Sequence, residues 1–283
     1  MSITINTLAV CGAGTMGAGI AQCAAQHGIH VILYDVHEPT LLKAQATIQA
    51  SLDTLVTKGK LTQPNATTIL QRLQYVTDAQ QCIADVIIEA IVEKLDVKVA
   101  LLNQLAEINH AETILATNTS SLSIAAIANG VLHPQRVVGM HFFNPATVMK
   151  LVEVIYTAHT SQATLATIQA LATILNKTTV TCADAPGFIV NRVARHYYLQ
   201  AMHIAVHEQV SYQVIDSLLQ SVGFKLGPFK LMDLIGNDIN YAVTEGLYQA
   251  FDQAVRFTPA PLQYNMVKRN KLGQKSGEGF YTY

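Results

Sequence analysis

The glycine-rich segment Gly12-Ala13-Gly14-Thr15-Met16-Gly17 limits the fold of this 283-residue chain more than any other feature. An apolar run over residues 6–11 predicts a buried strand before it, and small and apolar residues over 16–27 predict a helix after it. In such a unit the glycines permit a tight turn, close approach of a pyrophosphate and close packing of helix on strand. The start of the helix adds free N–H groups. We therefore expect a dinucleotide-binding loop formed by Gly12, Gly14, Thr15, Met16 and Gly17.

An acidic residue supports this interpretation and indicates which dinucleotide binds. A second predicted strand, His30–Tyr34, ends at Asp35, which lies 18 residues after Gly17. A carboxylate at this place accepts hydrogen bonds from the adenosine ribose and repels a 2′-phosphate, and no arginine follows it. We therefore expect NAD rather than NADP as the cofactor. A purely structural glycine turn is the alternative.

Strand and helix patterns alternate well beyond this first unit. After a helical pattern that ends at Gly59, apolar runs predict strands at residues 85–88, 113–116, 136–142, 151–156 and 178–182. This alternation favours an α/β fold of the Rossmann type, a mostly parallel sheet with helices on both faces. Pro186 and Gly187 indicate a boundary, and a long helix is expected over about residues 188–209. We predict a NAD-binding domain over residues 1–183 and an all-α domain over 184–283 for substrate binding and dimerisation.

Charge and composition argue against several classes of protein. Only 13% of the residues are charged, the net charge is −1 and no long basic run occurs, so no nucleic-acid partner is expected. No apolar run approaches the roughly 20 residues of a membrane-spanning helix, and the first residues do not resemble a signal peptide. The four cysteines lack metal-ligand spacing, which favours reduced thiols in a cytoplasmic protein. Because little charge covers the apolar residues, we expect some apolar surface to be buried in a homodimer.

Two polar segments lie at or after the ends of predicted strands, at residues 118–122 and 141–145. Glu153 lies inside an apolar strand, where an unpaired carboxylate is costly. His141 is its expected partner, because the loop at Asn144 and Pro145 can fold the two segments side by side. A histidine held by a carboxylate is oriented and more basic, which suits proton abstraction from an alcohol. A core histidine with its hydrogen bonds satisfied and a carboxylate on an exposed strand face are the alternative.

Several motifs occur in the same order as in one known family. After the glycine segment come Asn-Thr-Ser-Ser at 118–121, His-Phe-Phe-Asn-Pro at 141–145, Pro-Gly-Phe-Ile-Val-Asn-Arg at 186–192 and Gly-Pro-Phe at 227–229. Together they resemble the 3-hydroxyacyl-CoA dehydrogenase family, in its short single-function form, over the whole chain. The resemblance implies an oxidoreductase of fatty acid metabolism. It would oxidise a short L-3-hydroxyacyl-CoA, such as 3-hydroxybutyryl-CoA, reversibly to the 3-ketoacyl-CoA with NAD.

The resemblance also implies roles for the matching residues. His141 matches the catalytic base, and Glu153 matches the carboxylate that pairs with it. The residues expected to hold the 3-oxygen and the nearby carbonyl of the substrate are Ser120 and Asn191. The residues expected near the nicotinamide and its ribose are Glu93, Lys98, Asn118 and Asn144.

Three further features are interpreted with less support from the family pattern. Lys58 and Lys60 match a region of basic groups near coenzyme A, although two exposed lysines at a helix end are an equal alternative. Lys225 stands where relatives often have a proline, so the local loop differs from the family pattern. No metal is expected, and packing or surface positions are predicted for His196, His203 and His207.

Two other functions share these motifs. Relatives oxidise sugar acids such as L-gulonate without coenzyme A, and related lens crystallins are dinucleotide-binding structural proteins. The presence of His141, Glu153 and Ser120 in one chain argues against a non-catalytic protein. The acyl length that the enzyme prefers depends on the volume of a pocket, which the sequence does not define.

Overall fold

The computed structural model describes residues 5–283. Residues 1–4 lie outside the described part of the chain. The expectation that the first residues form no signal peptide therefore concerns mostly residues outside the described part. The described chain forms two compact units. One ends at Asp184 and the other runs from Ala185 to Tyr283.

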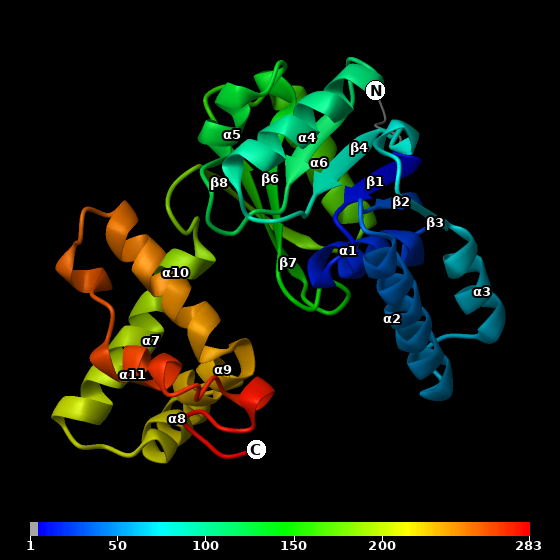
Figure 1. Ribbon diagram of the computed structural model, residues 1–283. Helices are drawn as coiled ribbons and strands as arrows, with labels where there is room; N and C mark the ends of the chain where they lie inside the picture. The colour runs from blue at the N-terminus through cyan, green and yellow to red at the C-terminus, as the bar shows by residue number, and fades with distance from the viewer. Residues whose placement is uncertain (1–4) are drawn as a thin grey trace. The chain divides into compact units, whose positions relative to one another are not determined.

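Among the described residues, the first unit is built on one eight-stranded sheet (Figure 1). In the order β3-β2-β1-β4-β5-β6-β7-β8, neighbouring strands are parallel except β6 and β7, which are antiparallel. The strand order changes direction at β1, and sheets of this class bind ligands beyond the carboxyl ends of their strands at such a point. The strands are β1 (Thr7–Cys11), β2 (His30–Tyr34), β3 (Leu73–Val76), β4 (Val86–Glu89), β5 (Ile114–Thr117), β6 (Val137–Phe142), β7 (Leu151–Tyr156) and β8 (Thr178–Ala183).

The mostly parallel sheet predicted from the sequence is confirmed, but the sequence analysis does not predict β3. This strand has the sequence Leu-Gln-Tyr-Val and lies at the edge of the sheet, with Gln74 exposed. An edge strand pairs on one side only, so fewer of its residues have to be apolar. The hydrophobic pattern of β3 is therefore too short and too mixed to distinguish it from the end of the preceding helix.

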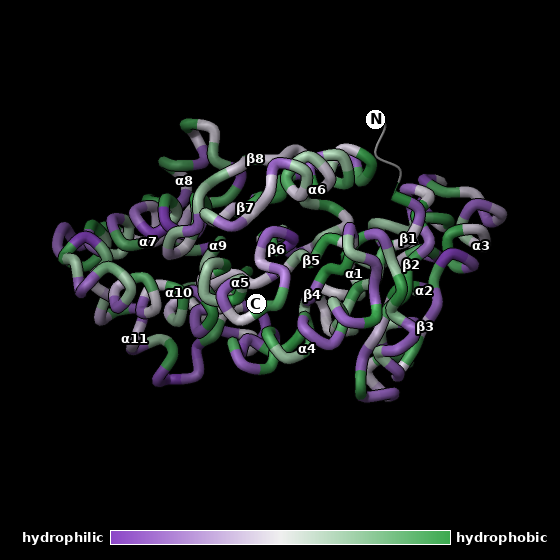
Figure 2. Tube along the Cα trace, turned by 90° about the horizontal axis from the view of Figure 1, so that it is seen from above, coloured by the Kyte–Doolittle hydropathy of each residue, from purple (hydrophilic) through white to green (hydrophobic). Residues whose placement is uncertain are grey.

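Helices cover both faces of the sheet. Apolar residues of α1, α2, α3 and α6, among them Ile20, Ile48 and Ile168, pack with the strands into one core. Figure 2 shows hydrophobic residues concentrated along β1 and β2, while the surrounding helices alternate between hydrophobic and hydrophilic residues. The bounds are α1 (Thr15–Gln26), α2 (Glu38–Thr57), α3 (Gln63–Gln71), α4 (Leu95–Ile108), α5 (Ile124–Gly130) and α6 (Gln162–Ile174).

The second unit is helical, which confirms the all-α region predicted after the sheet. Its core gathers aromatic residues and methionines, including Tyr198, Met202 and Phe229. Local signals begin its helices: the Ser211 side chain accepts a hydrogen bond from the Val214 N–H, and proline opens α9. No helix of the described residues is both long enough and apolar enough to cross a membrane. The bounds are α7 (Val190–His207), α8 (Tyr212–Ser221), α9 (Pro228–Ile235), α10 (Asn237–Ala250) and α11 (Pro261–Lys268).

Candidate functional site

The loop between β1 and α1 has room for a ligand beside its middle glycine. Gly12 has a φ of +103°, and a Cβ there would lie 2.5 Å from the carbonyl oxygen of Ala90. A Cβ on Gly17 would lie 1.7 Å from the carbonyl oxygen of Gly12, so a larger residue would separate α1 from the loop. A Cβ on Gly14, in contrast, would meet nothing within 4 Å. The second glycine therefore borders open space, as a pyrophosphate that approaches the backbone requires.

The start of α1 and the end of β2 complete a site that fits a dinucleotide. No side chain of the described residues caps α1, so the N–H groups of its first turn, from Thr15 onward, can bind an anion. Asp35 follows β2, and its Oδ2 accepts a hydrogen bond from the Ala13 N–H at 2.8 Å. Its Oδ1 accepts from the His37 N–H at 3.0 Å. The carboxylate is thereby held against the glycine loop, where a ribose would approach.

Four buried polar side chains share the other face of the sheet. Alternate residues of a strand point to opposite faces. The strand neighbours of these four residues pack into the core that α1, α2, α3 and α6 form. The four side chains must therefore point away from that core, and each belongs to a residue less than 9% exposed. They are Glu89 at the end of β4, Thr117 at the end of β5, His141 in β6 and Glu153 in β7.

His141 and Glu153 form a buried contact between their side chains. They are opposite each other in the antiparallel ladder of β6 and β7, and His141 Nδ1 lies 2.7 Å from Glu153 Oε2. Glu153 is fully buried, and the ring of Phe143 packs 4.7 Å from the imidazole. A carboxylate on Nδ1 fixes the ring's orientation and stabilises positive charge on it. The loop between the two strands therefore places an imidazole with a defined orientation on this face of the sheet.

A second charged cluster, which we call the Glu89 cluster, consists of Glu89, Lys98 and Glu93. Lys98, in α4, is 1% exposed, and its ammonium lies 2.6 Å from Glu89 Oε1 and 3.1 Å from Glu93 Oε2. Burial by itself would raise the pKa of Glu93. The hydrogen bond from Thr119 and the charge of Lys98 outweigh this effect and lower the pKa below its ordinary value. Glu93 is therefore held as a carboxylate.

The loop after β5 connects this cluster to the strand that carries His141. Glu93 Oε1 accepts hydrogen bonds from the Thr119 hydroxyl, from Ser121 Oγ at 2.8 Å and from the Ser120 N–H at 3.3 Å. Asn118 Oδ1 accepts from the N–H of Phe142, the residue after His141, at 2.9 Å. The structure thus brings the loop at residues 118–121 together with both the Glu89 cluster and β6.

The remaining residues predicted from the sequence are more dispersed. Asn144 is exposed in the loop between β6 and β7. Lys58 and Lys60 are exposed just beyond the end of α2, in the first unit. Asn191 belongs to the second unit, where it lies partly buried in the first turn of α7.

The sequence analysis assigns no individual role to Glu89, Thr117 or Ser121, although Ser121 belongs to the polar segment at residues 118–122. Glu89 ends the apolar strand Val86–Glu89, and a carboxylate within an apolar strand is the same signal that identifies Glu153. Its partner Lys98 lies nine residues away, at the start of α4. Thr117 and Ser121 are ordinary residues for a strand and a loop, so only the folded structure shows that they bind carboxylates.

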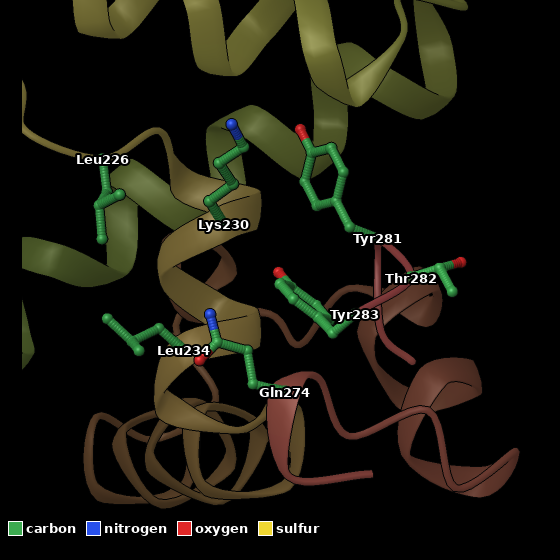
Figure 3. Close-up of a pocket in the computed structure, with 7 residues that line it drawn as sticks. All are labelled: Leu226, Lys230, Leu234, Gln274, Tyr281, Thr282 and Tyr283. Carbon is green, nitrogen blue, oxygen red and sulfur yellow. The ribbon is translucent and has the colours of Figure 1, made fainter. Parts of the chain in front are cut away.

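Described residues of the second unit line at least two cavities. One, of about 350 Å³, is lined by Lys230, Tyr281 and Tyr283 among others (Figure 3). The hydroxyls of the two tyrosines donate to the buried carboxylates of Asp216 and Asp233. The other, of about 770 Å³, is lined by α7 and the segment before α11. The histidines of α7 that were predicted to be packing or surface residues line this second cavity; they are His196, His203 and His207.

Known proteins resemble both units. The protein-family model described as the NAD binding domain of 3-hydroxyacyl-CoA dehydrogenase matches residues 7–185. The family model of the C-terminal domain of the same enzyme matches residues 187–283. The Escherichia coli protein named 3-hydroxyadipyl-CoA dehydrogenase is 48% identical over 100% of this chain, which spans only 60% of that relative. The mitochondrial hydroxyacyl-coenzyme A dehydrogenase of Sus scrofa is 39% identical over 99% of this chain and 92% of its own length.

A solved structure extends the similarity to three dimensions. The (S)-3-hydroxybutyryl-CoA dehydrogenase of Ralstonia eutropha matches with a TM-score of 0.94 and 38% identity, over 99% of both chains. The match covers the sheet with its glycine loop as well as the helical unit. The chain therefore belongs to the 3-hydroxyacyl-CoA dehydrogenase family, and it is an NAD-dependent oxidoreductase.

Proposed function

We propose that this enzyme oxidises short L-3-hydroxyacyl-CoA, represented by 3-hydroxybutyryl-CoA, reversibly to the 3-ketoacyl-CoA. The observation that carries the proposal is the contact of 2.7 Å between His141 Nδ1 and Glu153 Oε2, in a sheet that also carries the dinucleotide loop. A directed base next to a nicotinamide site is what removal of a hydroxyl proton and a hydride requires.

The protein's residues supply orientation and proton transfer. With Nδ1 held by Glu153, the Nε2 atom of His141 takes the proton of the 3-hydroxyl, and Glu153 stabilises the imidazolium that results. Bound NAD would supply the acceptor for the hydride that leaves C3 of the substrate. In the reverse direction the imidazolium returns its proton to the 3-oxygen as the ketone is reduced.

The other predicted site residues hold the ligands. Ser120 and Asn191 bind the 3-oxygen and the nearby carbonyl. The nicotinamide and its ribose are held by Glu93, Lys98, Asn118 and Asn144, and Lys58 and Lys60 interact with coenzyme A. The hydrogen bond from the Phe142 N–H to Asn118 supports this assignment, because it joins the loop of Ser120 to the strand of His141.

The names of relatives support the substrate class. The Ralstonia eutropha structure is named for (S)-3-hydroxybutyryl-CoA, and a Deinococcus radiodurans relative, 40% identical over 97% of this chain, is named a probable 3-hydroxybutyryl-CoA dehydrogenase. The S configuration corresponds to the L-3-hydroxyacyl form expected for this chain. The Escherichia coli relative is named for the longer 3-hydroxyadipyl-CoA, so chain length is part of the test.

The proposal includes a cytoplasmic homodimer. Exposed apolar residues of the second unit support the dimer, since Val206 is 53% and Val255 is 88% exposed, and both line the cavity of about 770 Å³. The four cysteines are free thiols, three of them buried, which suits a reducing compartment. Analytical ultracentrifugation at micromolar concentration should show a dimer, and a monomer alone would contradict this part of the proposal.

One assay tests the central claim. The purified enzyme is given acetoacetyl-CoA, 3-ketoadipyl-CoA and, in the oxidative direction, L-gulonate, each with the matching oxidised or reduced NAD or NADP. We expect rapid turnover of acetoacetyl-CoA with NADH. Turnover of L-gulonate in preference to the thioesters would replace the proposal with a sugar-acid dehydrogenase. No turnover of any substrate would favour a structural protein.

A further inference from the structure

Glu89 is a fully buried carboxylate with three hydrogen-bond donors. Its Oε1 accepts from the ammonium of Lys98 at 2.6 Å and from the Ile91 N–H at 2.7 Å, and its Oε2 accepts from Thr117 Oγ1 at 2.6 Å. Each donor directs a hydrogen at a carboxylate oxygen, so the ionised form is the one that this environment satisfies. Taking such a charge out of water is costly, and His141 and Glu153 do not use it. Its burial therefore calls for an explanation.

Glu89 is adjacent to the dinucleotide loop between β1 and α1. It pairs in register with Cys11, the last residue of β1, and the next N–H, of Ala90, donates to the Cys11 carbonyl at 2.7 Å. The carbonyl of Ala90 is the atom that a Cβ on Gly12 would touch at 2.5 Å. Backbone that leaves Glu89 is thus packed against the first glycine of the dinucleotide loop.

The Glu89 cluster has an excess of negative charge. Lys98 carries one positive charge and contacts two carboxylates, that of Glu89 at 2.6 Å and that of Glu93 at 3.1 Å. The formal charge of the three groups is −1. Among the described residues, the other ion pairs between lysine and carboxylate are made by two lysines of the second unit with carboxylates of that unit. Lys98 is therefore the one lysine that pairs with the cluster in the described part of the chain.

We propose that Glu89 sets the charge of the nicotinamide subsite, so that the site favours the oxidised cofactor, and that it holds Lys98 in position. This inference rests on the proposed function, which places Glu93 and Lys98 near the nicotinamide and its ribose. The nicotinamide ring is cationic in NAD⁺ and neutral in NADH. A cluster with a formal charge of −1 attracts the cationic ring and is nearly indifferent to the neutral one.

The size of the effect follows from electrostatics in a partly buried site. In a medium of effective dielectric constant near 20, a unit charge at roughly 10 Å from a cation changes a binding constant by on the order of tenfold. Glu89 thereby acts on the balance between the two cofactor forms, whereas His141 and Glu153 act on proton transfer. Glu89 is a positioning residue and does not touch the reacting atoms.

The test measures cofactor binding without any substrate. The dissociation constant of NADH is measured by its fluorescence, and that of NAD⁺ by competition, for the wild type and for Glu89→Gln. The glutamine side chain has the same shape as that of glutamate. Its amide oxygen can still accept a hydrogen bond from Lys98, and its amide N–H₂ can donate one to the Thr117 hydroxyl. We expect the ratio of the NAD⁺ constant to the NADH constant to rise by about tenfold, mainly through weaker NAD⁺ binding.

Two further variants separate charge from structure. Thr117→Val removes one donor to Glu89 but leaves the charge of the cluster unchanged, so the ratio should stay at the wild-type value. Glu89→Gln combined with Lys98→Met removes the ion pair and returns the formal charge of the cluster to −1, so the ratio should return toward the wild-type value. An unchanged ratio in Glu89→Gln, or an equal change in Thr117→Val, would overturn the inference.

The outcome stays decisive if Glu89→Gln does not fold. Glu89→Asp keeps the charge and shortens the side chain, so the proposal requires an unchanged ratio even where both constants weaken, and a changed ratio overturns it. A failure of the proposed function looks different. In that case the wild type would not reduce acetoacetyl-CoA, whatever the binding ratio of the two cofactor forms.

Discussion

The two units of this protein stabilise buried charges with different partners. In the first unit, Glu89 and Glu153 contact the cationic or titratable side chains of Lys98 and His141. In the second unit, the carboxylate of Asp233 accepts hydrogen bonds from the N–H groups of Phe280 and Tyr281, from Asn237 Nδ2 and from the Tyr283 hydroxyl. The first arrangement joins side chains on one face of a sheet, and the second ties the end of the chain to a helix.

Asp216 and Arg195 follow the pattern of the second unit. Asp216 accepts from the N–H groups of Phe229 and Lys230 at the start of α9. Arg195 donates to the carbonyl of Asn240 at 2.8 Å and to Thr244 Oγ1 at 2.8 Å, and burial lowers its pKa to about 10. Because neutral groups within the protein already satisfy these charges, the charges are not available to bind a ligand. The comparison predicts that charge changes in the first unit alter chemistry, whereas those in the second unit alter stability.

The largest effect should follow from loss of the base. His141→Gln should lower kcat by about 10²–10⁴-fold, because general acid–base catalysis contributes that much. Binding of NADH should change little, since the proposed dinucleotide site lies mainly at the loop of Gly12, Gly14 and Gly17. Stopped-flow and steady-state assays of acetoacetyl-CoA reduction measure the first quantity, and fluorescence titration measures the second.

Glu153→Gln is the matched variant for the same pair. It removes the charge that favours the imidazolium, so the pH profile of kcat/KM for oxidation should move to lower pH, with a smaller loss of kcat. The double variant should be little worse than His141→Gln alone, because residues that act as a unit are not additive. Multiplicative losses, or a profile that does not move, would mean that Glu153 has a purely structural role.

Much of this site could be predicted because its signals are local. The glycine loop and Asp35 each depend on a strand and the turn next to it, and periodicity reveals strands, whereas the pair of His141 and Glu153 was preferred over a core histidine only because of the family resemblance. The antiparallel hairpin of β6 and β7 follows from a short loop between two apolar runs. Glu93 and Lys98 were expected near the nicotinamide from the family resemblance, but their contact with Glu89 was not predicted, because it joins a strand end, a loop and a helix that are separate in the sequence.

The helical unit shows the same limit. The long helix α7 was predictable from its pattern, and its observed bounds, Val190–His207, fall within the expected residues 188–209. The contacts of Asp216 and Asp233 with backbone N–H groups were not, because they depend on how α8, α9 and the last residues pack. Hydrophobic pattern determines which segments are helices, whereas packing determines which carboxylates they bury.

A change of cofactor should have the next largest effect. Asp35→Ser with Val36→Arg replaces the carboxylate proposed to bind the ribose with a cation, and Val36 is 78% exposed. We expect the ratio of kcat/KM for NADH to that for NADPH to fall by on the order of a hundredfold, which corresponds to about 3 kcal/mol. A wild type that uses both cofactors equally would contradict this role of Asp35.

In the second unit, loss of a charge should affect stability rather than catalysis. In Asp233→Asn, an amide N–H₂ replaces one carboxylate oxygen and faces hydrogen-bond donors that then have no acceptor. The free energy of unfolding should therefore fall by about 2 kcal/mol. The kcat of the folded variant should remain within about twofold of the wild-type value. Urea denaturation measures the first quantity, with the exposed Asp252→Asn as the control. A stable but inactive Asp233→Asn would remove the distinction between the two units.

The smallest effect concerns acid stability in the first unit. Hydrogen bonds and Lys98 lower the pKa of Glu93 below its ordinary value of 4.5. A carboxyl with a lowered pKa in the folded state contributes stability above its unfolded value, and this contribution is lost as the pH falls through the folded value. The Glu93 side chain is 38% exposed, so solvent screens the interaction and the contribution should stay below about 1 kcal/mol.

Glu93→Gln tests this contribution through its dependence on pH. The variant should be slightly less stable than the wild type at pH 7, and the difference should shrink as the pH falls below about 4.5, because protonation removes the same charge from the wild type. Urea midpoints at pH 7, 5 and 4 measure it, with Glu107→Gln, an exposed carboxylate on α4, as the control. A difference that stays constant with pH would show that Glu93 contributes through packing.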